Sequence, residues 1–197
     1  YQVSKLKDLA RQMENDAEEV KKSQEKLTLC EGEIENSNQE QVKSGVEKVL
    51  KTHGIPNILI NNAGIEFNDS GNLVTMPYEK MKRIIDTNLM GYIHMLREVI
   101  PHMKGNGGGR IVNVSSVQAL QSCRPITSYQ PTKLAILGLT RLALEYARDG
   151  SNDDFIRINT IIPGKIRTEG MGNARLDTNP RALDDLLKST PIGRGGY

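Results

Sequence analysis

A tyrosine and a lysine four positions apart, Tyr129 and Lys133, are the residues of this chain best suited to acid–base chemistry. Residues i and i+4 share one face of a helix, so the phenol and the ammonium are expected to be neighbours. A free phenol has a pKa of about 10, and a nearby cation stabilises the phenolate. We therefore expect Lys133 to lower the pKa of Tyr129, and Tyr129 to exchange a proton with a substrate oxygen.

Two further positions offer polar groups at the ends or breaks of expected elements. Ser115 and Ser116 follow an apolar segment, residues 110–114, that is typical of a strand. Side chains alternate along a strand, so only one of the two serines can point at a substrate; the alternative is that both only terminate the strand. Asn88 is a poor helix former within a helical segment, which indicates either a chemical role or a local break of the helix.

Small, turn-forming residues follow two of the expected strands. Residues 62–64 come directly after the apolar segment 58–60, and residues 163–164 follow the expected strand 155–162. Ligands of open parallel sheets bind beyond the carboxyl ends of the strands, and Gly64 would let a ligand approach the backbone closely. This position favours a cofactor site over simple tight turns.

Helical and strand patterns alternate along the chain. The predicted helices span residues 4–26, 37–53, 77–103, 128–148 and 179–188, with a break near Thr87. The predicted strands span residues 27–30, 58–60, 110–114 and 155–162. Ser37 and Glu40 indicate a capping box, and Gly54 a left-handed helix end. The alternation predicts an α/β fold, a doubly wound open parallel sheet with helices on both faces.

The composition limits the classes of partner. A chain of 197 residues is long enough for one domain, and its net charge of +2 gives no reason to expect nucleic acid or an anionic membrane. Two cysteines and three histidines show no metal-ligand spacing, so we expect neither a metal site nor a disulfide framework. No segment approaches the ~20 apolar residues of a membrane helix. The cysteine usage fits a reducing compartment, and we expect a cytoplasmic location.

Six sequence blocks in a fixed order make the chain resemble the classical short-chain dehydrogenase/reductase (SDR) family, from about Asn57 to Gly193. The blocks are Asn61-Asn62-Ala63-Gly64, Asp86-Thr87-Asn88, Ser116, Tyr129-x-x-x-Lys133, Pro163-Gly164-Lys165-Ile166-Arg167-Thr168 and Pro191-Ile192-Gly193-Arg194. Any single block is a weak signal, whereas all six at plausible spacings are a strong one. The resemblance implies a Rossmann-like fold.

The resemblance also implies a reaction and a set of site residues. It implies an NAD(P)-dependent oxidoreductase that interconverts a ketone and a secondary alcohol of a small molecule by hydride transfer, with NAD or NADP as cofactor. The family's serine lies thirteen residues before its tyrosine, which selects Ser116 as the group that polarises the substrate oxygen. Asn88 would hold a water molecule linked to Lys133, and Lys133 would also hold the ribose of the cofactor.

The resemblance therefore gives the following residue sets. The catalytic residues would be Asn88, Ser116, Tyr129 and Lys133, and the cofactor-binding residues would be Asn62, Ala63, Gly64, Tyr129, Lys133, Pro163, Gly164, Ile166 and Thr168. By the same resemblance, helices 88–103 and 128–148 would form the contacts of a homodimer or homotetramer.

One departure from the family concerns its phosphate-binding loop, a Gly-rich turn whose N–H groups hold the pyrophosphate. Only Gly32 and Gly45 precede residue 54. We therefore expect residues 1–197 to form a single, incomplete dinucleotide-binding and catalytic domain, without the first strand–turn–helix unit and the C-terminal end of the family. Two alternatives stay open: a catalytically silent scaffold or subunit without a cofactor site, and a helical interaction protein built on residues 4–50.

Overall fold

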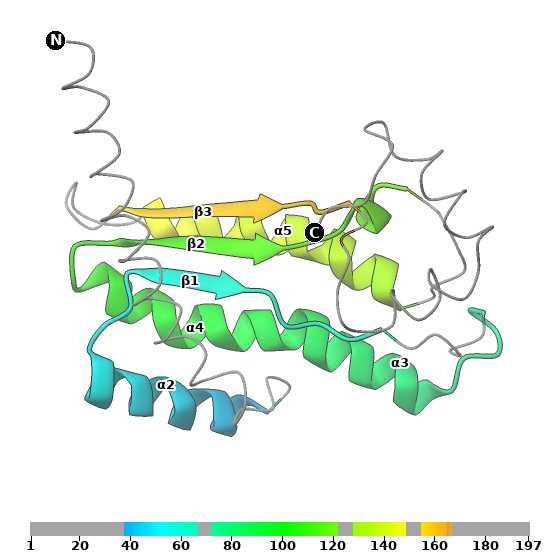
Figure 1. The fold of residues 1–197 in the computed structure, drawn as a ribbon, viewed down its shortest axis with the longest axis horizontal. Coiled ribbons are helices and arrows are strands. Elements are labelled where there is room, and N and C mark those ends of the chain that lie inside the picture. The colour runs from blue at the N-terminus through cyan, green and yellow to red at the C-terminus, as the bar shows by residue number, and fades with distance from the viewer. Residues whose placement is uncertain (1–37, 67–71, 122–127, 149–154, 165, 167–197) are drawn as a thin grey trace, which may run out of the picture.

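The structure, a computed structural model, describes residues 38–66, 72–121, 128–148, 155–164 and 166. The predicted helices 4–26 and 179–188 and the predicted strand 27–30 lie outside these residues, as does Thr168. The described part contains an α/β arrangement in which helices lie against a small sheet (Figure 1).

The sheet consists of three parallel strands in the order β1-β2-β3: β1 (Ile58–Asn61), β2 (Gly109–Val114) and β3 (Ile156–Ile161). Asn61 pairs with Asn113, and Val114 pairs with Ile161. Because the strands are parallel, their carboxyl ends lie at the same edge of the sheet (Figure 1). This edge is where ligands of such sheets bind.

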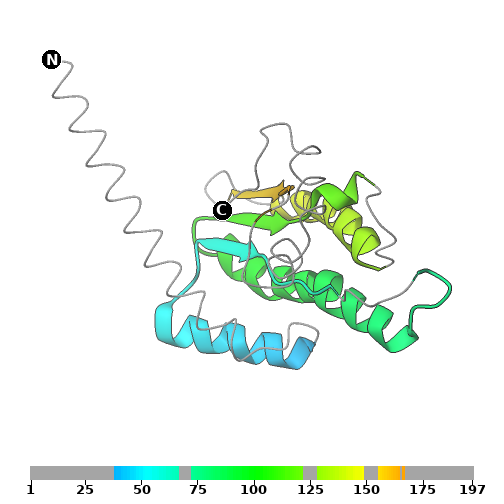
Figure 2. The same cartoon turned by 45° about the vertical axis from the view of Figure 1, so that its right-hand side comes forward.

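Three helices, α2 (Gln39–His53), α4 (Gly91–Lys104) and α5 (Tyr129–Arg148), pack against one face of the sheet (Figures 1 and 2). The core between them contains Val42, Val46, Leu59, Leu96, Val99, Met103, Ile111, Ala143, Ile156 and Ile158. On the opposite face, Ile60 and Ile161 are 40% and 49% exposed. Within the described ranges no helix covers that face, so the second helical layer stays a prediction.

Local sequence signals explain how α2 begins and ends. The Asn38 side-chain oxygen accepts hydrogen bonds from the N–H groups of Glu40 and Gln41, at 3.0 and 3.2 Å. The capping box predicted from Ser37 is therefore wrong, because the neighbouring asparagine, an equally strong N-cap residue, caps the helix. Gly54 ends the helix with a φ of 78°, and its N–H donates to the Leu50 carbonyl.

The break predicted near Thr87 is a π-helical turn, residues 86–90, between α3 (Tyr78–Ile85) and α4. Such a turn holds one more residue than an α-helical turn and is frequent at functional sites. It contains the buried Asn88. The turn thus places a polar side chain beside the carboxyl end of β1, at the edge of the sheet described above.

Candidate functional site

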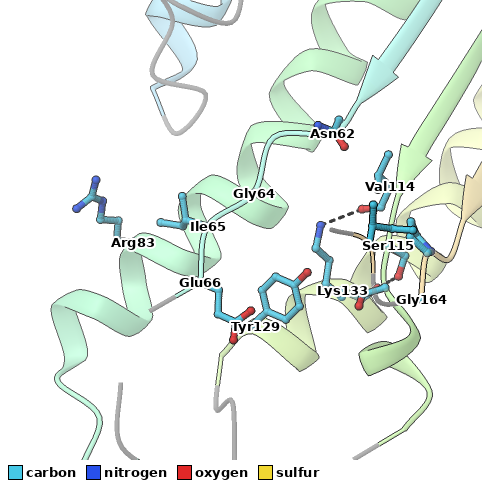
Figure 3. Close-up of a pocket in the computed structure, with 13 residues that line it drawn as sticks. Asn62, Gly64, Ile65, Glu66, Arg83, Val114, Ser115, Tyr129, Lys133 and Gly164 are labelled. Carbon is cyan, nitrogen blue, oxygen red and sulfur yellow. Dashed lines mark hydrogen bonds between the residues drawn. The ribbon is translucent and has the colours of Figure 1, made fainter. Parts of the chain in front are cut away.

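A cavity of about 680 Å³ opens at the carboxyl ends of the strands (Figure 3). The ends of the strands and the segments that follow them, the first two turns of α5 and one residue of α3 line it. The lining residues are Asn62, Gly64, Ile65, Glu66, Arg83, Val114, Ser115, Ser116, Tyr129, Lys133, Pro163, Gly164 and Ile166. Most of the predicted site residues within the described ranges therefore meet at one cavity. Ala63 and Asn88 are not among its lining residues.

Lys133 is 3% exposed, and its ammonium group lies between aromatic rings and a carbonyl. Its Nζ donates a hydrogen bond of 2.9 Å to the main-chain carbonyl of Val114 (Figure 3). The centroids of the Tyr129 and Tyr92 rings lie 5.5 and 5.7 Å from Nζ. Burial lowers the pKa of Lys133 to about 8, because a charged amine is disfavoured away from water.

Tyr129 begins α5 and points its hydroxyl into the cavity (Figure 3). Burial raises its pKa above the usual value of 10, a hydrogen bond with Ser116 lowers it, and the Glu66 carboxylate raises it. The pKa shift is opposite to the one predicted from the sequence, because burial disfavours the phenolate more than Ser116 stabilises it. At neutral pH the phenol therefore carries its proton.

The two neighbouring serines at the end of β2 have different partners. The Ser115 hydroxyl donates to the main-chain carbonyl of Lys133 at 2.7 Å, and its N–H donates to the Ile161 carbonyl at 2.9 Å. The Ser116 hydroxyl accepts from the N–H of Gln118 at 3.2 Å and also interacts with Tyr129. Ser115 thus joins β2 to α5 and β3, whereas Ser116 is the serine that contacts the phenol.

Asn88 holds the loop that follows β1. Its Oδ1 accepts from the N–H of Ile65 at 2.7 Å, and its Nδ2 donates to the carbonyl of Ile65 at 2.9 Å and to the Thr132 hydroxyl at 3.4 Å. The side-chain amide is thus committed to protein groups. The water molecule that the family resemblance implies at Asn88 stays a prediction.

Gly64 is a place where the backbone and the Lys133 ammonium approach each other. A Cβ at this position would lie 3.3 Å from Lys133 Nζ and 3.5 Å from Asn88 Oδ1. The first of these contacts is tight enough that the lysine end would have to shift by a few tenths of an ångström, whereas the second is an ordinary van der Waals distance. The lack of a side chain at Gly64 therefore keeps the space beside the ammonium open, as a cradle for a ligand requires.

A buried chain of polar side chains lies behind the cavity and was missed in the sequence. Asn61 Nδ2 donates to Asn113 Oδ1, and Asn113 Nδ2 donates to Thr140 Oγ1, both at 2.9 Å. Thr140 donates to the carbonyl of Ile136 at 2.9 Å and lies 2.6 Å from Thr160 Oγ1. This network ties all three strands to α5. The signal available was one asparagine directly after the expected strand 58–60 and one within the expected strand 110–114.

Two kinds of feature are absent from the described ranges. Among residues 38–66, 72–121, 128–148, 155–164 and 166, no cluster of histidine, cysteine, aspartate and glutamate could hold a metal ion. In the same part of the chain, no helix combines the length and the apolarity needed to cross a membrane.

Comparisons with known proteins agree with this geometry. The family model described as short chain dehydrogenase matches residues 2–179. The 2-(R)-hydroxypropyl-CoM dehydrogenase of Xanthobacter autotrophicus is 36% identical over 152 residues, which are 76% of this chain and 58% of that protein. The 3-oxoacyl-[acyl-carrier-protein] reductase FabG of Thermotoga maritima is 35% identical over 162 residues, 81% of this chain and 61% of the reductase.

Solved structures give the same result at the level of the fold. ElxO with NADP bound has a TM-score of 0.73 and 31% identity, and the match covers 83% of this chain and 63% of that chain. A gluconate 5-dehydrogenase from Burkholderia cenocepacia, in complex with NADP and tartrate, has a TM-score of 0.73 and 29% identity, covering 83% and 61%. With a family model that matches residues 2–179 and a Rossmann-like fold, the chain belongs to the short-chain dehydrogenase family.

Proposed function

We propose that the protein is an NAD(P)-dependent oxidoreductase that interconverts a ketone and a secondary alcohol of a small molecule by hydride transfer. The observation that carries this proposal is the convergence of Tyr129, Ser116 and Lys133 on one cavity at the carboxyl ends of three parallel strands. Family membership and the names of the relatives support the reaction class. The proposal covers one dinucleotide-binding and catalytic domain over residues 1–197.

The residues present fit a nicotinamide cofactor. Asn62, Pro163, Gly164 and Ile166 line the cavity beside Lys133, and a Cβ at Gly64 would obstruct the same space. Two of the similar solved structures contain NADP, which supports NAD or NADP here. Together with Ala63, Tyr129 and Thr168, these are the residues that would hold the cofactor. When bound, a nicotinamide supplies or accepts the hydride.

In the direction of reduction, Tyr129 is the proton donor and Ser116 the second hydroxyl at the substrate carbonyl oxygen. Since burial keeps the pKa of Tyr129 above its usual value, the phenol is protonated at neutral pH, which is the state that a proton donor needs. The Lys133 ammonium, 5.5 Å from the Tyr129 ring, stabilises the phenolate that forms. In oxidation, Tyr129 accepts the proton of the alcohol.

The position of Asn88 supports a role in holding the site together. Its amide fixes the Ile65 backbone, and Ile65 lines the cavity. We propose that Asn88 acts with Ser116, Tyr129 and Lys133. Its side chain would hold the loop that follows β1, and its main chain would bind a water molecule. The proposed location is cytoplasmic, on the basis of the cysteine usage.

We further propose a homodimer or homotetramer through helices 88–103 and 128–148. Leu134 and Leu142 lie two turns apart on one face of α5 and are 52% and 53% exposed. Exposed leucines on one helix face favour contact with a second copy. Light scattering after size exclusion should show an oligomer, and Leu134→Lys should shift it toward the monomer. A wild-type monomer at micromolar concentration would refute this part of the proposal.

The function is tested by following the oxidation of NADPH and NADH with a panel of ketones, using the natural full-length protein. Tyr129→Phe should lower kcat by about 10²–10⁴-fold, the usual contribution of a positioned acid. The matched control is Tyr78→Phe, since Tyr78 is 71% exposed and outside the cavity. Equal rates in Tyr129→Phe and wild type would overturn the role of Tyr129. Failure to bind either cofactor would favour the catalytically silent scaffold.

A further inference from the structure

Tyr92 lies against the Lys133 ammonium but has no part in the chemistry described above. It belongs to α4, is 2% exposed and does not line the cavity. Its ring centroid is 5.7 Å from Lys133 Nζ. Its hydroxyl donates a hydrogen bond of 3.2 Å to the carbonyl of Val114. A buried tyrosine with both its ring and its hydroxyl committed at one place calls for a specific explanation.

The Val114 carbonyl is the point at which Tyr92 and Lys133 meet. It accepts hydrogen bonds from Lys133 Nζ and from the Tyr92 hydroxyl, at 2.9 and 3.2 Å. A carbonyl oxygen has two lone pairs, so these two donors use its full accepting capacity. Because the Tyr92 hydroxyl uses one lone pair of the Val114 carbonyl, only the other lone pair is available to Lys133. This restricts the position of Lys133 Nζ.

The two tyrosine rings come from different helices and flank the same ammonium. Tyr129, from α5, has its ring centroid 5.5 Å from Nζ, and Tyr92, from α4, has its centroid 5.7 Å away. The face of an aromatic ring attracts a cation within about 6 Å. A buried ammonium has lost most of its water, so such contacts help to keep it charged in place.

We propose that Tyr92 is a positioning residue that holds the Lys133 ammonium beside Tyr129. The ring makes the larger contribution, because it faces the cation directly, and the hydroxyl makes the smaller one through the Val114 carbonyl. The proposal adds a residue to the site of the proposed function, and its effect on catalysis rests on that function. Its effect on the position of the Lys133 side chain does not depend on that function.

The direct test is NMR of the protein with ¹³C-labelled lysine. Two nearby rings should displace the ε-methylene signal of Lys133 from those of the other lysines, and Lys133→Met identifies it. Nuclear Overhauser contacts between this methylene and the Tyr92 ring are expected in the wild type. Tyr92→Phe should preserve the displacement, and Tyr92→Met should remove a large part of it.

The second test compares the kinetics of the same variants. Tyr92→Met should lower kcat/KM about tenfold, the factor that corresponds to a desolvated cation–aromatic contact of about 1–2 kcal/mol. Tyr92→Phe should restore activity to within about threefold of the wild type. Val99→Ala, another core residue of α4 that is 3% exposed, controls for general loosening and should leave the Lys133 signal and kcat/KM unchanged.

Several outcomes would overturn the inference. One is a wild-type spectrum without contacts between Lys133 and the Tyr92 ring, which decides the matter even if Tyr92→Met does not fold. Another is a Tyr92→Met protein whose Lys133 signal has not moved. A third is equal loss of activity in Tyr92→Phe and Tyr92→Met. If the wild-type protein has no oxidoreductase activity, the proposed function is refuted, but the contacts between Lys133 and Tyr92 are not.

Discussion

The Ser115 hydroxyl donates a 2.7 Å hydrogen bond to the main-chain carbonyl of Lys133, and both residues are 3% exposed. Through its own N–H, Ser115 also contacts the Ile161 carbonyl. The residue that precedes Ser116 therefore fixes the turn of α5 from which the Lys133 side chain extends. Ser115 and Ser116 are adjacent in the sequence but have different contacts, so their alanine variants can be compared directly.

We expect Ser115→Ala to lower the free energy of unfolding by about 0.5–1.5 kcal/mol, because it removes a buried hydrogen bond to α5. Ser116→Ala should lower kcat, and it should lower the free energy of unfolding less than Ser115→Ala does, because Ser116 is only half-buried. Urea titration and steady-state kinetics of the two variants separate the effects. Similar stability of the two proteins would contradict the structural role of Ser115.

The rate of reduction should depend on the charge of Lys133. With the pKa of Lys133 lowered to about 8 by burial, kcat/KM measured for the cofactor should be steady below this pH and fall above it as the ammonium loses its proton. Burial raises the pKa of Tyr129 above its usual value, so the phenol does not cause a fall that begins near pH 8. A pH–rate profile checks the prediction, and a profile flat to pH 10 would rule it out.

The lowered pKa of Lys133 should also make the free energy of unfolding depend on pH. The pKa of Lys133 is about 8 in the folded chain and 10.5 in the unfolded one, so the unfolded chain binds more protons between these values. The free energy of unfolding of the wild type should therefore rise with pH across this window. Lys133→Met, which keeps an unbranched side chain, should be more stable by roughly 1–3 kcal/mol at pH 7.

The gain in stability from Lys133→Met should shrink between about pH 8 and pH 10.5, because the folded wild type has by then lost the proton that the unfolded chain still binds; only above pH 10.5 is the lysine neutral in both states. Thermal or urea unfolding of both proteins from pH 7 to pH 10 measures this difference. A pH-independent difference would mean that the Lys133 charge is not desolvated. The variant should also have lost its oxidoreductase activity, so stability and function would change in opposite directions.

Gly64→Ala should lower cofactor affinity and activity by at least tenfold. The new Cβ would lie 3.3 Å from Lys133 Nζ, so either the loop or the lysine has to move. The control is Gly105→Ala: its nearest contact would be an ordinary 3.8 Å, and its φ of −81° suits alanine. Fluorescence titration with NADPH compares the two. If both variants bind as the wild type does, the close approach at Gly64 has no functional meaning.

The parts of the site that could be predicted depend on local spacing. The four-residue interval between Tyr129 and Lys133 and the alternation of Ser115 and Ser116 follow directly from helix and strand geometry. The break near Thr87 was also predicted, and the structure identifies it as a π-helical turn. Helix and strand periods are properties of neighbouring residues, so sequence alone contains them.

The parts that could not be predicted depend on contacts between distant residues. Asn61 and Asn113 meet only because β1 and β2 pair in one register, and Tyr92 meets Lys133 only because α4 and α5 pack on the same face. The predicted direction of the Tyr129 pKa shift was wrong for the same reason. Burial dominates that shift, and burial is set by the whole fold.

The π-helical turn at residues 86–90 fixes the angular phase between α3 and α4. One residue of an α-helix corresponds to a rotation of about 100°. Removing a single residue from this turn would let the two helices merge into one regular rod, with α4 rotated by that angle relative to α3. If Asn88 kept its contact with Ile65, Arg83 of α3 would then turn away from the cavity that it lines.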